Sequence, residues 1–213
     1  MDSTATSRYK ATLGRYLKPD VVDKVFAFFN RHETDLHITR ARRSKWGDYR
    51  WPQHGCPRHV ISVNGNLNPY LFLMVLLHEM AHLLTYQQYK GAVLPHGHEW
   101  QDNYRRLLAQ YAEAGHFPQE SLPALKRYTA QLPLYGPAGN EFEETLRRYD
   151  KDYDPLASLT LNELPIGSRF RLKSKPEMLF ESLEKLRTRY RCIELHSGVP
   201  FLVAGRAQVV REN

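Results

Sequence analysis

The segment "LMVLLHEMAHLLTY" at residues 73–86 places His78, Glu79 and His82 inside an almost unbroken apolar run. Burying an uncompensated charge is costly, and even a neutral imidazole needs polar partners, so the three side chains require an explanation. Two histidines four residues apart lie one above the other on a helix face and can bind the same cation. The pattern H-E-x-x-H is typical of zinc hydrolases, in which the glutamate acts as general base on a zinc-bound water. We therefore predict His78 and His82 as metal ligands and Glu79 as the catalytic base.

A catalytic zinc needs a third protein ligand and an open fourth position. The segment "PHGHEW" at residues 95–100 offers His96 and His98. His96 would lie at the end of a loop, free to point back toward the first two histidines, whereas His98 would already belong to the first turn of the following helix. The spacing thus favours His96 as the third ligand and leaves His98 as the alternative.

The elements that must position these side chains predict an α+β fold. We expect a helix from Pro19 and a second, buried helix at about 69–87, capped by Asn68 with Pro69 at its first position. A third helix follows and closes at Gly115. The segments "DLHITR", "GDYRWP" and "RHVISVN" are expected to form one small sheet.

The sequence as a whole predicts a division of the chain into three parts. Residues 1–117 would form the metal-binding domain, and residues 118–157 a helical and linker segment. Residues 158–213 would form a small β-rich module with strands at "RFRL", "RYRCIEL", "PFLVAG" and "AQVV".

The composition limits where the protein is expected to reside and how many metal ions it can bind. The 213 residues contain no apolar run of the roughly 18 residues that a membrane span needs, so we expect a cytoplasmic protein without membrane contact, with association with the nucleoid as an alternative. We also expect a monomer. The two cysteines, Cys56 and Cys192, cannot build a four-cysteine zinc site. His54, Cys56 and His59 are close in sequence but lie in an expected turn without a fourth ligand. We therefore predict one Zn²⁺ per chain.

The formal charge of +7 is unevenly distributed. The stretch "RARRSKWGDYRW" at residues 40–51 combines cations with aromatic rings, and a second basic cluster, "KLRTRYRC", occupies residues 185–192. Cations neutralise phosphates and flat rings stack on unpaired bases, so the first stretch predicts contact with single- or double-stranded DNA. Its candidate residues are Arg40, Arg42, Arg43, Lys45 and Trp46. The alternative is a hairpin whose charges are simply solvated.

Three segments together resemble the SprT-like zinc metallopeptidases, which include the eukaryotic Spartan proteases. They are "HVISVN", "LLHEMAH" and "HGHEW", within residues 15–115. The resemblance implies a zincin-like domain with His78, His82 and His96 as ligands and Glu79 as the base. It also implies that "HVISVN" is the strand nearest the cleft, where an extended peptide substrate could add a strand.

The C-terminal part departs from the family pattern. Many SprT-like proteins carry a four-cysteine zinc ribbon there, and "RYRCIELHSGVPFLV" resembles half of a ribbon that has lost most of its cysteines. In such a degenerate ribbon, apolar residues would replace the stabilising metal. The expected replacements are Ile193, Leu195, Phe201 and Leu202.

These observations predict a zinc-dependent endopeptidase that acts on a protein or peptide substrate associated with nucleic acid. One alternative is a nucleic-acid or transcription-associated binding protein with a structural zinc. Another is a zinc hydrolase acting on a bond other than a peptide. Because only a hydrolase requires a base beside the metal, Glu79 favours an enzyme. Tyr86, Tyr104 and Arg105 are open candidates for stabilising the oxyanion.

Overall fold

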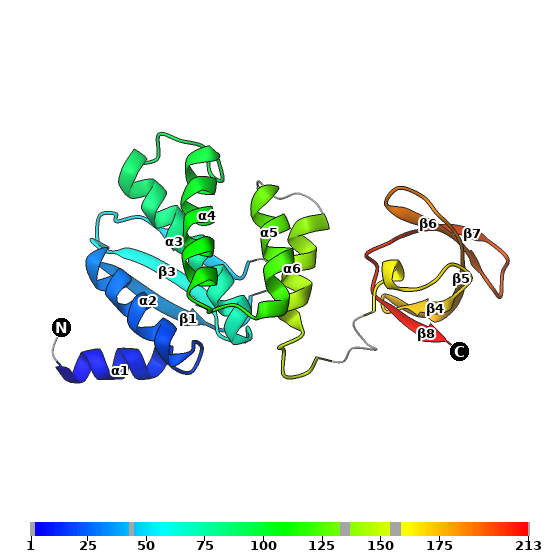
Figure 1. Cartoon of the computed structure of the whole chain (residues 1–213), viewed down its shortest axis with the longest axis horizontal. Coiled ribbons are helices and arrows are strands. Elements are labelled where there is room, and N and C mark those ends of the chain that lie inside the picture. Colours follow the sequence, from blue (N-terminus) through cyan, green and yellow to red (C-terminus); the bar gives the residue numbers. More distant parts are fainter. Residues whose placement is uncertain (1–2, 43–44, 133–136, 154–158, 213) are drawn as a thin grey trace. The chain divides into compact units, whose positions relative to one another are not determined.

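The computed structural model divides into two compact units, Met1–Lys151 and Asp152–Asn213, shown in Figure 1. It describes residues 3–42, 45–132, 137–153 and 159–212. The division falls after Lys151, six residues before the predicted boundary at 157, and the two units show no division after residue 117.

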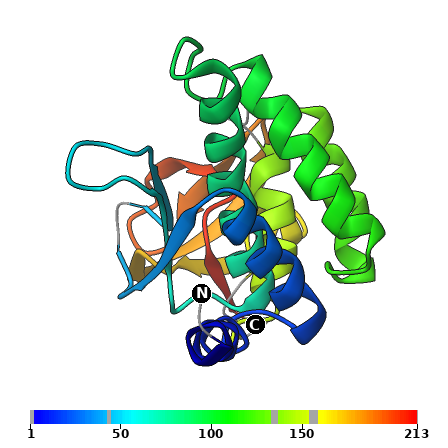
Figure 2. The same cartoon turned by 90° about the vertical axis from the view of Figure 1, so that its left-hand side faces the viewer.

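The first unit contains a three-stranded sheet of β1 (Thr34–Thr39), β2 (Gly47–Arg50) and β3 (His59–Asn64). β3 lies in the centre, parallel to β1 and antiparallel to β2. The expectation that "HVISVN" is the strand nearest the cleft is therefore wrong, because β3 is paired on both sides. The edge strand beside the central helix is β2. In Figure 2 the loop that joins β2 to β3, coloured cyan, projects away from the rest of this unit.

The central helix α3 (Pro69–Tyr89) carries the H-E-x-x-H motif, and its sequence explains where it begins and ends. The Asn68 side chain accepts hydrogen bonds from the backbone N–H groups of Tyr70 and Leu71, and Pro69 occupies the first turn. Lys90 ends the helix in a left-handed conformation, followed by Gly91 at φ 83°. Buried apolar residues cover nearly all of its faces, as the sequence predicted.

Three further helices belong to the first unit. α2 (Pro19–Arg31) buries Val21, Val22, Val25 and Phe29, and α4 (His98–Glu113) packs against α3. α1 (Ser3–Leu13) was not anticipated, because its sequence has little helical periodicity.

Helices α5 (Leu122–Ala130) and α6 (Pro137–Arg147) belong to the core of the first unit. Tyr128 of α5 packs on Tyr104 of α4, and Phe142 of α6 is fully buried. The Asn68 side chain also donates to the carbonyl of Leu146, which joins the end of α6 to the start of α3. The segment after residue 118 is thus part of the scaffold around the motif.

The second unit is an antiparallel sheet in the order β7-β6-β5-β4-β8. Its strands are β4 (Arg169–Leu172), β5 (Lys175–Lys185), β6 (Arg189–Glu194), β7 (Pro200–Ala204) and β8 (Val209–Glu212). Four match predicted segments, and β5 was not anticipated. The short 3₁₀ turns η1 (Gln119–Ser121) and η2 (Leu161–Glu163) lie outside the sheets.

The core of this sheet differs from the expected one. Leu202 is 57% exposed and Ile193 only partly buried, because alternate residues of a strand face opposite sides. Cys192 is buried among Phe170, Phe180 and Val203. Apolar packing does stabilise the module, but the kinship with a zinc ribbon stays a prediction.

Within the described residues, no helix combines the length and apolarity needed to cross a membrane.

Candidate metal centre

The structure brings His78, His82 and His96 together at one point. Their Nε2 atoms lie 3.2 Å apart for His78 and His82, 3.0 Å for His82 and His96, and 3.2 Å for His96 and His78. Three nitrogens this close can all approach one ion at the roughly 2.0–2.1 Å of a zinc–imidazole bond. Among the described residues, they form the one cluster of potential ligands, without a fourth His, Cys, Asp or Glu.

Local structure explains why His96, and not His98, completes the cluster. His96 lies in the loop between α3 and α4 at φ 59°, a left-handed conformation that is uncommon for non-glycine residues. Two residues later, His98 is the first residue of α4 and is exposed outside the cluster. The structure thus places His96, and not His98, beside His78 and His82, and the role of His96 as a ligand stays a prediction.

The three imidazoles are suited to bind a cation because they stay neutral. Burial lowers the pKa of His78 well below its ordinary value, and His82 and His96 lower it further. Burial and the neighbouring His96 lower the pKa of His82 to about 4, and burial also lowers that of His96. A neutral imidazole offers a lone pair to a metal, so this donor set fits zinc.

Trp100, on the first turns of α4, packs against all three imidazoles. Its ring centroid lies 4.6 Å from that of His78, 5.3 Å from that of His82 and 4.5 Å from that of His96. Trp100 is buried, so its indole restricts the rotation of the imidazoles and holds them on one side of the site. Sequence reasoning did not assign Trp100 this role.

Glu79 lies next to the histidines, in the wall between α3 and the edge strand β2. Its side chain is 6% exposed, and burial, together with the charge of Asp48, raises its pKa to about 8. Gly47 of β2 leaves the room that Glu79 occupies: a Cβ atom at Gly47 would overlap the Glu79 carboxylate and approach Val75 Cγ1 to 2.8 Å. No pattern in the sequence could indicate this contact, because Gly47 and Glu79 meet only when β2 packs on α3.

Glu79 and the three histidines line one pocket of about 410 Å³. β2 contributes Gly47, Asp48 and Tyr49 to its wall. Its rim carries apolar side chains, of which Trp51 is 50% and Leu94 78% exposed. Trp51 stacks on Tyr86 at a ring separation of 5.7 Å. The pocket thus combines three potential metal ligands with an apolar, aromatic rim.

The structure distinguishes the three candidates for stabilising the oxyanion by where their side chains lie. Tyr86 lines the pocket. Tyr104 is fully buried, and its hydroxyl donates to the carbonyl of Met74. Arg105 donates to the carbonyls of Thr129 and Leu132 at the end of α5. Of the three, Tyr86 alone faces the pocket.

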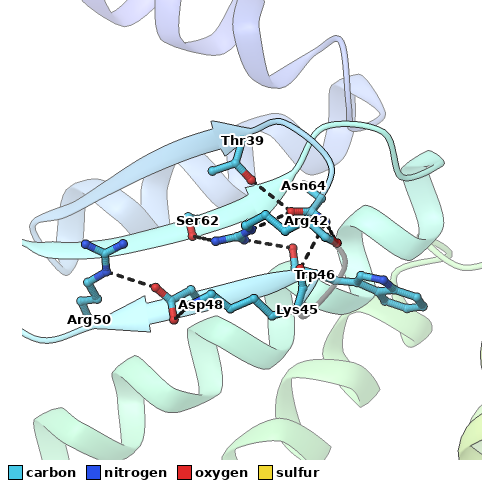
Figure 3. Close-up of polar contacts among 8 residues, drawn as sticks. All are labelled: Thr39, Arg42, Lys45, Trp46, Asp48, Arg50, Ser62 and Asn64. Atoms are coloured by element: carbon cyan, nitrogen blue, oxygen red, sulfur yellow. Dashed lines mark hydrogen bonds and ion pairs between the residues drawn. The ribbon is translucent and has the colours of Figure 1, made fainter.

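The candidate nucleic-acid residues are largely engaged within the protein, as Figure 3 shows for Arg42. Its guanidinium donates from Nε to Asn64 Oδ1 at 2.9 Å, from Nη1 to Ser62 Oγ at 3.1 Å and from Nη2 to the Trp46 carbonyl at 3.4 Å. The buried Asn64 amide donates in return to the carbonyls of Arg42 and Lys45. Arg42 therefore fixes the chain between β1 and β2 onto β3.

The other candidates differ in how far they are engaged. Lys45 forms a 2.7 Å ion pair with Asp48, and Trp46 is covered by the guanidinium of Arg147, 5.0 Å from its ring. Arg40 is exposed, and Arg43 lies outside the described residues.

The second cysteine and histidine cluster is not assembled into a metal site. Cys56 is exposed, and His59 Nδ1 lies 2.9 Å from the Tyr49 hydroxyl. Within the part of the chain that the structure describes, His54, Cys56 and His59 do not bring three ligand atoms together.

Three histidines, two on α3 and one in the following loop, converge beside a buried glutamate of α3 in an α+β domain. This arrangement is typical of metal-dependent hydrolases. Comparison with known proteins finds a similar family: residues 20–120 match the model of the SprT-like family. This region of the chain is therefore similar to SprT-like domains, which are typically zinc metallopeptidase-like.

A relative supports this assignment. Protein SprT from Glaesserella parasuis serovar 5 (strain SH0165) is 35% identical over 103 residues, which cover 48% of this chain and 64% of that protein. The chain thus spans less than two thirds of the length of this relative. No solved structure matches the chain significantly.

Proposed function

We propose that this chain is a zinc-dependent endopeptidase. The observation that carries the proposal is the convergence of three neutral imidazoles beside a buried carboxylate in one open pocket. His78, His82 and His96 would hold the ion and leave a position open toward the pocket, as in catalytic zinc sites. A bound zinc ion supplies a positive charge that polarises a carbonyl, lowers the pKa of water and favours the ionised form of Glu79.

Glu79 would act as the general base and then as the general acid. Its carboxylate accepts a proton from the attacking water and returns it to the amine that leaves when the peptide bond breaks. The low exposure of Glu79 suits this role because few waters compete for the carboxylate. The missing side chain at Gly47 leaves the room that the Glu79 carboxylate occupies.

The walls of the pocket support a peptide substrate. β2 is an edge strand, so its outer backbone groups can pair with an extended chain. The rim formed by Trp51, Tyr86 and Leu94 can receive an apolar side chain of that chain. This combination of sheet edge and apolar pocket is less suited to a small polar substrate.

The alternative of a binding protein with a structural zinc has less support. Structural zinc sites are closed by four protein ligands. Within the described residues the cluster has three, and it opens onto a pocket.

We further propose that the protein works near nucleic acid, through different residues from those first considered. The side chains of three exposed arginines have no hydrogen-bond or ion-pair partner among the described residues: Arg187, Arg189 and Arg206. The turn of Arg206 adjoins the β5–β6 hairpin, because the Gly205 N–H donates to the Thr188 carbonyl. Such unpaired cations can contact phosphates, which Arg42 cannot do without giving up internal hydrogen bonds.

The test of the proposed hydrolysis is Glu79→Gln in the zinc-loaded full chain. The amide cannot accept the proton, so cleavage of casein or of an unstructured peptide, with and without DNA, should fall by about 10²- to 10⁴-fold. Zinc content should stay unchanged, because the ligands remain. Glu113→Gln, at an exposed position of α4, is the matched control and should cleave like wild type. Equal cleavage by wild type and Glu79→Gln would refute the assignment.

A further inference from the structure

The loop that carries His96 needs support from outside itself. Its left-handed residue is strained relative to an extended one, and the neighbouring Leu94 and Pro95 are exposed. Within the loop, the Gly97 N–H donates to the Leu94 carbonyl. Residues in sparsely populated backbone conformations persist only when their surroundings fix them.

Gln101 supplies such support. It is 3% exposed, one turn into α4, and its Nε2 donates to the carbonyl of His96 at 3.0 Å. The bond fixes the His96 peptide group, and with it the direction in which the imidazole leaves the backbone. Gln101 does not line the pocket, so it can act only through His96.

Arg105 sets the orientation of the Gln101 amide. Its Nη2 lies 3.3 Å from Gln101 Oε1. A guanidinium can only donate, so the amide oxygen must face Arg105 and the NH₂ group must face His96. The reverse orientation would place two donors against each other and two acceptors against each other.

Arg105 is in turn held by the end of α5. Its Nε donates to the Thr129 carbonyl at 3.0 Å and its Nη2 to the Leu132 carbonyl at 3.3 Å, while Nη1 pairs with Asp102 at 3.0 Å. Carbonyls at a helix C-terminus lack intrahelical partners and favour a cation. Thr129 and Leu132 lie beyond residue 120, where the SprT-like match ends.

We propose that Gln101 and Arg105 are positioning residues that fix His96 in the metal site and connect it to helix α5. The inference rests on the proposed function, because it takes the three histidines as zinc ligands. It gives the helical segment after the SprT-like match a role in the metal site. It also explains why a glutamine and an arginine are held one helical turn apart on the face of α4 that meets α5.

Gln101→Glu in the full chain tests the proposal. The carboxylate keeps the shape of the amide and the contact with Arg105 but cannot donate to the His96 carbonyl, so zinc should bind about 10- to 100-fold more weakly. Zinc affinity is measured by competition with a chromogenic chelator. With Co²⁺ as the probe, the visible absorption bands should shift or weaken, because the ligand geometry changes.

Two controls separate positioning from a general loss of stability. Gln110→Glu makes the same substitution at an exposed position of α4 and should bind zinc like wild type. Arg105→Gln leaves Gln101 in place but removes its anchor, and should also weaken zinc binding. It decides the question by the same measurements when Gln101→Glu does not fold.

The outcomes distinguish this inference from the proposed function. Unchanged zinc affinity and an unchanged Co²⁺ spectrum in a folded Gln101→Glu or Arg105→Gln variant would overturn the positioning role. A wild-type chain that binds zinc but cleaves nothing would overturn the proposed hydrolysis alone. A wild-type chain that binds no zinc would overturn both.

Discussion

At the scale of the residue, the site depends on a close contact between Glu79 and the backbone of Gly47. Glu79 is buried against β2, and the missing side chain at Gly47 is what admits its carboxylate. Gly47 is the first residue of β2, and a glycine in a strand often marks the close approach of another group.

Gly47→Ala should therefore impair catalysis while sparing the metal site. The added Cβ would displace the Glu79 carboxylate or push β2 away from α3, and we expect cleavage to fall at least about tenfold, since a small misplacement of a catalytic group is costly. The zinc content should not change, because the histidines are untouched. Peptide cleavage and metal analysis measure the two effects.

Gly14→Ala is the control for the glycine substitution, since a Cβ there meets nothing closer than 3.4 Å. Normal cleavage by Gly47→Ala would mean that Glu79 adjusts freely and that the close approach has no catalytic consequence.

At the scale of the element, the sheet is connected by a network of polar side chains as well as by its ladders. Asn64, at the end of β3, accepts hydrogen bonds from the side chains of Arg42 and Thr39. Its amide donates to the carbonyls of Arg42 and Lys45, which precede β2. Part of the basic stretch before β2 therefore stabilises the sheet. These contacts favour internal hydrogen bonding over phosphate contact as the role of Arg42.

Arg42→Ala and Arg189→Ala should consequently behave in opposite ways. Removing Arg42 leaves the buried Asn64 short of a donor and should destabilise the first unit by about 1–3 kcal/mol. The Arg189 side chain has no partner among the described residues, so its truncation should leave the melting temperature unchanged. It should instead weaken DNA binding and flatten the salt dependence. Thermal unfolding and DNA titrations at several salt concentrations are the measurements.

Arg40→Ala, at an exposed position nearby, should leave the melting temperature as it is. A stable Arg42→Ala protein with reduced DNA affinity would restore the first basic stretch as a nucleic-acid site.

At the scale of the whole molecule, the chain consists of two units with separate cores. The cluster of His78, His82 and His96 belongs to the first unit. In the second, buried apolar side chains surround Cys192, and Cys192 belongs to no ligand cluster among the described residues. Zinc should therefore stabilise one unit and not the other.

Removing zinc with a chelator should lower the unfolding temperature of the first unit alone. Binding to the folded state contributes about 2.7 kcal/mol when free zinc is 100-fold above its dissociation constant. Calorimetry of the full chain should show one transition that shifts with zinc and one that does not, with one zinc per chain by metal analysis. His96→Ala should remove most of the shift. Two zinc ions per chain, or a shift of both transitions, would contradict this division.

The sequence alone determined the part of the site that lies on one helix. His78, Glu79 and His82 share α3, where a fixed helical repeat converts spacing into geometry, and the capping residues Asn68 and Pro69 set where that helix begins. His96 was also accessible to sequence reasoning, because it lies at the end of a loop where its side chain is free to turn back toward α3, whereas His98 is held in the first turn of α4.

The tertiary structure alone decided the contacts between elements. Local patterns do not record strand order, so β2, and not β3, proved to be the edge strand at the pocket. Nor do they record the approach of Gly47 to Glu79, the internal use of Arg42, or the path from α5 through Arg105 and Gln101 to His96. Each joins residues on different elements, and their proximity arises only when the elements pack into one core.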